Sequence, residues 1–329
     1  MIWYKNNDAN IVVSTRIRLA RNLEGVPFPA ALKDVSEVTE KIKNSILASN
    51  STLAKDFDFI DLDNTSTDEK ERLREEHLIS PQMAEGKGHS VLINRDRTMS
   101  IMLMEEDHIR LQIIEGGNRL NEAYETASRV DDVIEESLTY AFDDEFGYLT
   151  ACPTNAGTGL RASVMLHLPA LTMTENINRI IASVSGMGIA VRGLYGEGTK
   201  AYGNLYQVSN QVTMGVSEQE IIEKLNNVVK QITDAEQKTR EALMEKNGDF
   251  VTNRVRRSCG LLKYAYTMDS SEARELLSDV ILGQNLGILE KGAVLPLECM
   301  INVTPSFIGG SDPAERDKKR AKYLNDNVL

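Results

Sequence analysis

Most of the strand-like segments of this chain follow one another too closely to pair as parallel neighbours. They are runs of alternating or β-branched residues, and most are separated by short polar turns such as Asn94–Arg97. A parallel pair needs a crossover of about a dozen residues, whereas antiparallel neighbours need only a tight turn. The sequence therefore predicts an antiparallel sheet. The predicted strands span residues 11–19, 90–93, 99–104, 108–114, 147–150, 162–168, 189–194 and 204–209.

Helical periodicity appears at 35–49, at 118–142, at 173–185 and from Ser217 onward. In the last of these stretches, apolar residues fall on one stripe of a 3.6-residue helix, and Ser217 with Glu220 matches a capping box. We expect this helix to lie on the sheet. The stripe consists of Ile221, Ile222, Leu225, Val228, Val229, Ile232 and Ala235.

The character of the chain changes near Gly248. Two further helical patterns follow, at 251–266 and 270–282, the second preceded by a plausible cap at Asp269, and a charged tail occupies 311–320. Strands before this point and helices after it predict an α+β fold. We expect an antiparallel sheet flanked by helices in a catalytic domain at 1–247, followed by a small all-helical C-terminal domain at 248–329.

Charge and composition exclude several kinds of protein. The net charge of −12 argues against a nucleic acid or an anionic membrane as the main partner, because both require a basic surface. No leader-like segment and no run of eighteen apolar residues is present, so we expect a cytoplasmic protein. Three scattered cysteines and four scattered histidines lack metal-ligand spacing, which predicts no metal bound directly by the protein.

The segment Cys152–Arg161, CPTNAGTGLR, has a composition suited to an anion. Its glycines permit close backbone approach, its Thr and Asn side chains donate hydrogen bonds, and Arg161 can grip a phosphate with two parallel hydrogen bonds. The Walker pattern GxxxxGK[ST] is absent. An ordinary tight connection between two strands is the alternative interpretation.

Three other segments have similar chemistry. Arg16 and Arg18 are two residues apart, so on a strand both project from one face, with Arg21 close behind. The run 105–110, EEDHIR, places carboxylates and an arginine at a strand end, and 192–199, RGLYGEGT, places Glu197 between two glycines. Each segment also has a simpler interpretation. The arginines of 16–18 could lie on a solvated strand edge, 105–110 could be a polar hairpin corner, and 192–199 could be a flexible turn.

Together these segments bring five guanidinium groups to strand ends, together with acidic groups at 105–106 and at Glu197. Such arginines suit a nucleoside triphosphate, whose transferring phosphoryl group spreads negative charge over its oxygens. The carboxylates suit a cationic acceptor. The five arginines are Arg16, Arg18, Arg110, Arg161 and Arg192.

The motifs STRIRLARN, EEDHIR, GYLTACPTNAGTGLR and RGLYGEG, in this order, resemble those of the guanidino phosphotransferases, which include the creatine and arginine kinases. The resemblance covers about residues 14–246. It implies ATP-dependent transfer of the γ-phosphoryl group to a guanidinium nitrogen, and an antiparallel sheet flanked by helices.

The resemblance also implies roles for individual residues. Glu106 and Glu197 are expected to grip the guanidinium with Glu105 nearby, and Cys152 to be the active-site thiol. Mg²⁺ is expected to accompany ATP, held mainly by the phosphates. The residues expected to bind ATP are Arg16, Arg18, Arg110, Arg161, Arg192, Ser14, Thr15 and His77.

Two departures point to one branch of the family. The small-molecule kinases carry a helical domain before the STRxR motif, whereas here only 13 residues precede Ser14. Those kinases also end soon after the helix that corresponds to 217–246, whereas this chain continues with residues 248–329. Both features resemble the bacterial protein-arginine kinases. The sequence RDKKRA also fits the motif RDxxRA, by which that branch binds phosphoarginine at an allosteric site, here Arg316, Asp317 and Arg320.

The resemblance implies partners as well. These are protein substrates with exposed arginine, a second copy of the chain in a homodimer, a zinc-containing activator protein, a Clp unfoldase and a transcriptional repressor, in stress response and protein quality control. The expected function is phosphorylation of arginine side chains, marking proteins for degradation or inactivating a stress repressor. A kinase for free arginine and a non-enzymatic phosphoarginine-binding adaptor remain alternatives.

Overall fold

A computed structural model describes residues 2–5, 7, 10–48, 55–193, 201–290, 295–310 and 312–328. Eight strands form one sheet in the order β2-β3-β4-β5-β1-β8-β10-β9, and every neighbouring pair is antiparallel. The predicted antiparallel sheet is confirmed. The strands are β1 (Val12–Arg21), β2 (Phe57–Asp61), β3 (Ser90–Asn94), β4 (Met99–Leu103), β5 (Ile109–Gly116), β8 (Leu160–His167), β9 (Ile189–Gly193) and β10 (Leu205–Asn210), with a separate hairpin of β6 (Phe142–Asp143) and β7 (Gly147–Tyr148).

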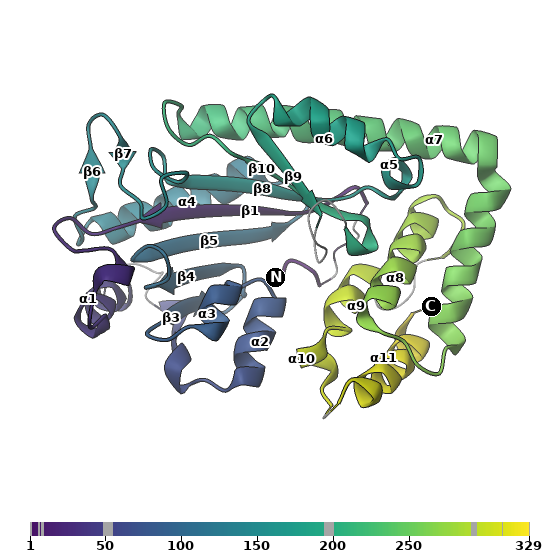
Figure 1. Ribbon diagram of the computed structural model, residues 1–329, viewed down its shortest axis with the longest axis horizontal. Coiled ribbons are helices and arrows are strands. Elements are labelled where there is room, and N and C mark those ends of the chain that lie inside the picture. The colour runs from purple at the N-terminus through teal and green to yellow at the C-terminus, as the bar shows by residue number, and fades with distance from the viewer. Residues whose placement is uncertain are drawn as a thin grey trace.

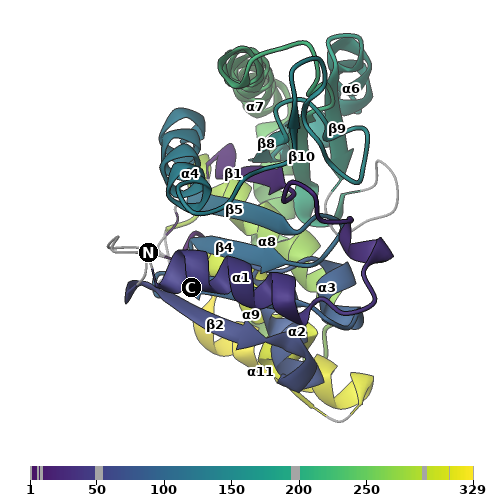
Figure 2. The same cartoon turned by 90° about the vertical axis from the view of Figure 1, so that its left-hand side faces the viewer.

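Helices cover the two faces of the sheet unequally (Figures 1 and 2). The described α-helices are α1 (Ser36–Leu47), α2 (Thr67–Glu75), α3 (Pro81–Glu85), α4 (Leu120–Glu135), α5 (Pro169–Met173), α6 (Ile177–Ser185), α7 (Glu218–Tyr264), α8 (Ser270–Asn285), α9 (Pro296–Asn302), α10 (Pro305–Ile308) and α11 (Pro313–Asn327). Short 3-10 turns include η4 (Tyr202–Asn204). The sequence patterns did not predict β2, β6, α2, α3 or the helices after α8.

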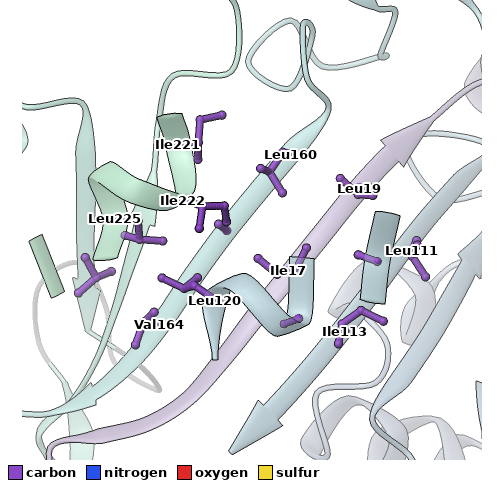
Figure 3. Close-up of a cluster of buried hydrophobic side chains, with 14 of the residues drawn as sticks. Ile17, Leu19, Leu111, Ile113, Leu120, Leu160, Val164, Ile221, Ile222 and Leu225 are labelled. Atoms are coloured by element: carbon purple, nitrogen blue, oxygen red, sulfur yellow. The ribbon is translucent and has the colours of Figure 1, made fainter. Parts of the chain in front are cut away.

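One face, which we call the packed face, holds the main core. Ile17 and Leu19 of β1 point into it, between apolar residues of α4 and of the first half of α7 (Figure 3). This explains why α7 carries a stripe: Ile222 and Leu225 are fully buried, and the predicted capping box of Ser217 and Glu220 is present. The alternation along β1 therefore sends its even-numbered residues to the opposite face.

The opposite face, which we call the site face, is covered only at its two ends. At one end α2 and α3 bury a small cluster that includes Leu73 and Met83 against β3 and β4. At the other end the C-terminal helices pack on the sheet and on the N-terminal residues Trp3 and Tyr4. Figure 1 shows this arrangement, with α2 and α3 beneath the strands and α8 to α11 beside one end. A stretch of sheet between the two covers remains accessible.

The change of character near Gly248 is a bend within a helix. The helix α7 runs through this point, with a single non-helical conformation at Asn247 (φ −138°, ψ 31°). Figure 1 shows α7 running along the top of the sheet and then turning down along the C-terminal helices. Two predicted helices, from Ser217 and from Val251, are therefore one bent helix, because no Pro or cap interrupts the hydrogen-bonded ladder. The predicted helix at 173–185 is instead divided, and Glu175 between α5 and α6 has φ 58°.

Candidate active site

The register of the central strands places the predicted arginines on one face. Arg18 of β1 lies between Gln112 of β5 and Arg161 of β8. Residues paired across neighbouring strands project to the same side of a sheet, so the two guanidinium groups share the site face. Ala20, two residues further along β1, pairs with Arg110 of β5 in the same way.

The remaining two arginines join this group through β10. Gln207 of β10 pairs with Arg192 of β9, and its side-chain Oε1 accepts a hydrogen bond of 2.8 Å from Arg16 Nη2. All five predicted arginines line one cavity of about 610 Å³, which we call cavity A. Its lining residues are Arg16, Arg18, Ala20, Pro81, Glu106, Arg110, Cys152, Thr154, Asn155, Gly159, Arg161, Arg192, Gln207 and Ser209.

The arginines of cavity A are costly to hold together. Burial, and then the neighbouring charges of Arg16, Arg110 and Arg161, keep the pKa of Arg18 well below its usual range. Burial and the charges of Arg192 and Arg110 lower the pKa of Arg161 as well. Like charges gathered in a partly desolvated site raise the free energy of the unliganded protein. A polyanion bound among them would remove that penalty.

The two neighbouring glutamates have different surroundings. The Glu105 side chain is only 3 % exposed, is paired with Arg110 Nη1 and accepts a hydrogen bond of 2.5 Å from Ser80 Oγ. Glu106 is 39 % exposed, lines cavity A, and lies 3.3 Å from Arg110 Nη2. Glu105 therefore fixes Arg110, whereas Glu106 has a carboxylate oxygen to offer a ligand. The resemblance assigned Glu106 rather than Glu105 to the guanidinium, and the difference in burial between the two side chains is a property of the folded chain.

The loop 152–161 supplies side chains to cavity A and uses its backbone for packing. The thiol Sγ of Cys152 lies 3.1 Å from Thr154 Oγ1, and both residues line the cavity. The N–H of Gly157 donates to Tyr148 O at 3.3 Å, and the N–H of Thr158 donates to Thr213 O at 2.9 Å. These two N–H groups are therefore not available to an anion. Residue 157 must be a glycine for two reasons: its φ is 101°, and a Cβ atom would overlap the carbonyl oxygen of Thr213.

A second cavity of about 530 Å³, which we call cavity B, adjoins cavity A. The two share Arg16, Arg18, Pro81, Arg110 and Gln207. The residues that line cavity B and not cavity A are Arg74, Glu75, His77, Ile79, Ser80, Met102, Gln112, Ser270, Arg274, Thr304 and Pro305.

His77 was predicted to bind ATP, and it lines cavity B. Desolvation, followed by the charges of Arg16, Arg74 and Arg274, lowers its pKa to about 3. The ring is therefore neutral at pH 7. Its backbone has φ 66°, an uncommon conformation for a non-glycine residue.

Ser14 and Thr15 line neither cavity. Both are buried, and the Thr15 hydroxyl donates to Gly117 O at 2.8 Å and accepts from the N–H of Arg119 at 2.9 Å. Thr15 thus ties β1 to the start of α4. Arg21, the third basic residue of the motif, faces the packed face, where it pairs with Asp131 at 2.7 Å and lies over the Tyr148 ring.

The predicted Glu197 lies outside the described residues. Among the predicted C-terminal residues, Arg320 is 2 % exposed and donates to Val303 O and Met268 O, both at 2.8 Å. It also pairs with Asp317 Oδ1 at 2.6 Å. The Asp317 side chain is 33 % exposed, and Arg316 Nη1 donates to Gly310 O at 3.3 Å. Arg320 therefore holds α11 in place.

Several lining residues were not found from the sequence. Gln207 sits within a strand and Arg74 within a charged helix, where neither has a distinguishing motif. Arg274 and Thr304 belong to the C-terminal helices, far from the sheet motifs in sequence. The packing of α8 against the 3-10 turn η4 helps to bring Arg274 to cavity B.

Comparison with known proteins agrees with this geometry. Residues 37–239 match the family model of the ATP:guanido phosphotransferase C-terminal catalytic domain, and residues 248–329 match that of the protein-arginine kinase McsB C-terminal domain. The chain is 45% identical to a protein-arginine kinase of Brevibacillus brevis, covering 99% of this chain and 94% of that protein. It is 42% identical to the protein-arginine kinase of Bacillus subtilis, with 99% and 93% covered.

Solved structures share the fold. A lombricine kinase superposes with a TM-score of 0.61 at 26% identity, covering 69% of this chain and 66% of that one. A duplicated taurocyamine kinase from Schistosoma mansoni, with bound components of a transition-state analog, gives a TM-score of 0.62 at 26% identity, covering 75% of this chain and 37% of that one. Within the described residues, no helix has the length and apolar character needed to cross a bilayer.

Proposed function

Since the chain belongs to the protein-arginine kinases of the ATP:guanido phosphotransferase family, we propose the following roles for its residues in the phosphorylation of arginine side chains in proteins. The triphosphate of ATP lies on the five arginines of cavity A. The observation that carries this proposal is that these arginines, together with Glu106 and Cys152, line a single cavity although they come from four separate segments.

The acceptor guanidinium enters beside Glu106. One of its nitrogens attacks the γ-phosphorus, the N–P bond forms as the bond to the β,γ-bridging oxygen breaks, and ADP leaves. A guanidinium is too weak an acid to be deprotonated beforehand, so its proton is lost as the N–P bond forms. Glu106 aligns the nitrogen and accepts this proton, and Glu197 is proposed to act as the second carboxylate. Cys152 places a sulfur atom beside the same pocket.

The arginines stabilise charge as it develops on the transferring group. Donors fixed by β1, β5, β8 and β9 need not reorganise during the reaction, which is the main advantage of a preorganised site. Arg110 is held by Glu105, which in turn is held by Ser80. Glu105 is therefore proposed as a positioning residue.

Mg²⁺ is proposed to accompany ATP. Among the described residues that line cavity A, Glu106 is the one carboxylate, so oxygen ligands from the protein are few. This donor set fits an ion held mainly by phosphate oxygens and water. When bound, the ion would neutralise charge on the β- and γ-phosphates.

The C-terminal helices are proposed to form a second functional unit, 248–329, that binds phosphoarginine and mediates homodimer formation. Arg316 and Asp317 lie at the start of α11 with part of each side chain exposed. One suits the phosphate and the other the guanidinium of this ligand. Arg320 supports the site from beneath by fixing Asp317.

We also propose a cytoplasmic setting, with a zinc-containing activator protein, a Clp unfoldase and a transcriptional repressor as partners, in which phosphorylation marks proteins for degradation. These rest on the resemblance of the motifs to the family. Co-purification of the tagged enzyme with these partners from stressed cells, with a Glu106→Ala variant as comparison, tests them.

The assignment of the site is tested with purified enzyme, ATP and an arginine-rich protein. Acid-labile phosphoarginine should accumulate in the protein, and free arginine should be a poor acceptor. Faster ATP consumption with free arginine than with protein would support the small-molecule alternative. Retention of full activity by Glu106→Ala would contradict the proposed catalytic site.

A further inference from the structure

Cavity B is where the C-terminal helices meet the proposed nucleotide site. Its walls come from both parts of the chain: Arg16, His77 and Met102 belong to the sheet and its surroundings, whereas Arg274 and Thr304 belong to the C-terminal helices. Cavities A and B share Arg16 and Arg18 and are therefore neighbours. A ligand longer than cavity A would extend into cavity B.

The chemistry of the two cavities fixes the direction of the nucleotide. Glu106 and Cys152, which define the end where the acceptor reacts, line only cavity A. The γ-phosphate must therefore lie in cavity A, and the nucleoside must lie at the other end of the phosphate chain. Cavity B offers apolar surface from Met102 and Pro305, a neutral imidazole at His77, and arginine side chains. This apolar surface and the neutral ring, which line only cavity B, suit a base and a ribose, and the arginines suit the phosphates next to them.

The position of Arg274 is set by close packing. Arg274 is 9 % exposed and lies in the first turns of α8. A Cβ atom added at Gly203 of η4 would lie 3.1 Å from the carbonyl oxygen of Arg274 and 3.4 Å from its Cβ. One turn further along α8, the hydroxyl of Ser278 forms hydrogen bonds with His167 Nε2 at 2.7 Å and with Asn204 Nδ2 at 2.8 Å.

The second C-terminal wall is fixed as well. The N–H of Ser306 donates to Glu75 Oε2 of α2 at 3.1 Å, and Val303 O accepts from buried Arg320. Thr304 and Pro305, between these anchors, therefore face cavity B from a segment held at both ends. Glu75 itself lines the cavity.

We propose that the C-terminal helices complete the nucleotide site: Arg274 of α8 contacts the nucleoside end of ATP or ADP, and the 304–305 segment closes the wall beside it. This inference rests on the proposed function, since it takes the triphosphate to lie in cavity A. Bound nucleotide then joins the C-terminal helices to the sheet. Nucleotide affinity thereby depends on how the C-terminal helices are placed.

The test compares a nucleotide with an inorganic phosphate chain that carries no nucleoside. Binding of ADP and of inorganic tripolyphosphate is measured by calorimetry for the full-length protein and for Arg274→Ala, Arg274→Lys, Arg161→Ala and the control Arg256→Ala, an exposed arginine of α7. Loss of one charge-assisted hydrogen bond corresponds to about a tenfold loss of affinity.

Arg274→Ala should bind ADP about tenfold more weakly while its affinity for tripolyphosphate changes by less than about twofold, and Arg274→Lys should fall between. Arg256→Ala should match the native protein. Unchanged ADP binding, or equal losses for both ligands, would overturn the inference. Because no acceptor is present, the proposed acceptor chemistry is not at issue. If Arg161→Ala kept native affinity for both ligands, the proposed phosphate site would be the part that fails.

A second measurement uses only the native protein and so does not depend on the folding of a variant. Amide hydrogen exchange is followed in the first turns of α8 and at 303–308. Saturating ADP should slow exchange in both segments, and saturating tripolyphosphate should not. Equal exchange with and without ADP in these segments would contradict the proposal.

Discussion

At the scale of single residues, the same residue type performs different tasks depending on its surroundings. Arg18 and Arg161 lie in cavity A, and burial among like charges lowers the pKa of both. Arg21 is more deeply buried than either, but it pairs with Asp131 and stacks on Tyr148. A buried arginine with protein partners stabilises the fold, whereas partly buried arginines gathered without enough carboxylates indicate an anionic ligand.

The Glu106→Gln substitution tests the carboxylate of cavity A. It removes the negative charge that aligns the acceptor while preserving the shape of the side chain. We expect kcat for protein phosphorylation to fall by about 100-fold to 10,000-fold, with a smaller change in KM for ATP. Glu122→Gln, an exposed residue of α4, is the matched control and should retain native kcat.

The Gly157→Ala substitution tests the backbone of the 152–161 loop. The added Cβ would lie 2.3 Å from Thr213 O, and φ at this position is 101°. The combined strain and overlap should lower the free energy of unfolding by about 3 kcal/mol. Gly25→Ala is the control, because φ is 70° and nothing lies within 4 Å, so about 1 kcal/mol is expected. Equal losses in urea denaturation would show that the contact with Thr213 has no effect.

At the scale of the elements, buried ionic groups connect helices that hydrophobic patterning alone would not place. Glu236 of α7 is fully buried and accepts hydrogen bonds from the N–H groups of Ala170 at 3.1 Å and Leu171 at 2.9 Å, at the start of α5. Arg240, one turn further along α7, pairs with Glu236 and donates to Asn10 Oδ1. A single pair thus joins α7, α5 and Asn10, which lies two residues before β1.

The Arg240→Met substitution should be strongly destabilising. It leaves the buried carboxylate of Glu236 without its countercharge, which costs about 3–5 kcal/mol of unfolding free energy. Lys319→Met is the control, because its pair with Glu315 is exposed and should contribute less than about 1 kcal/mol. Urea denaturation of both variants measures the difference, and a loss below that of Lys319→Met would contradict this account.

At the scale of the whole molecule, the two parts of the chain share a core. One cluster joins Trp3, Tyr4 and Met165 to residues of the C-terminal helices such as Leu277 and Leu324. Residues 248–329 match a family model of their own, yet their buried apolar side chains share one cluster with residues from the rest of the chain. The proposed division at Asn247 is therefore one of function, with packing that crosses it.

A chain that ends at Asn247 should fold poorly. Its main core would be intact, but Trp3, Tyr4 and Met165 would lose their cover and α7 would lose its second half. We expect a lower Tm than that of the full chain, together with binding of a hydrophobic dye and aggregation. A monomeric fragment with the Tm of the full chain would show that the shared cluster adds nothing to stability.

Acid stability should depend on His77. Its pKa is about 3 in the folded protein and 6.5 when unperturbed, so between these values the unfolded state binds a proton that the folded state does not. The contribution of neutral His77 to the free energy of unfolding is fully present above pH 6.5 and is lost as the pH falls towards 3. His77→Asn, which tolerates the positive φ, should show a weaker decline of Tm over this range. An identical decline in both proteins would exclude His77 as a cause.

The amino-acid sequence by itself determined the antiparallel sheet, the long capped helix and the chemistry of the main motifs. Short turns, alternating residues and the Ser217–Glu220 box are local properties, and local geometry decides them. The arginines of β1 shared a face because the period of a strand is two residues. The motifs also carried the family resemblance, which the comparisons bear out.

Only the tertiary structure decided which of these residues share a cavity. Glu105 and Glu106 are neighbours in sequence, yet one is buried against Arg110 and the other faces cavity A. Arg274 reaches cavity B because α8 packs on η4, a contact between segments about seventy residues apart. Burial, ion pairing and cavity walls depend on long-range packing, and no local pattern along the chain encodes them.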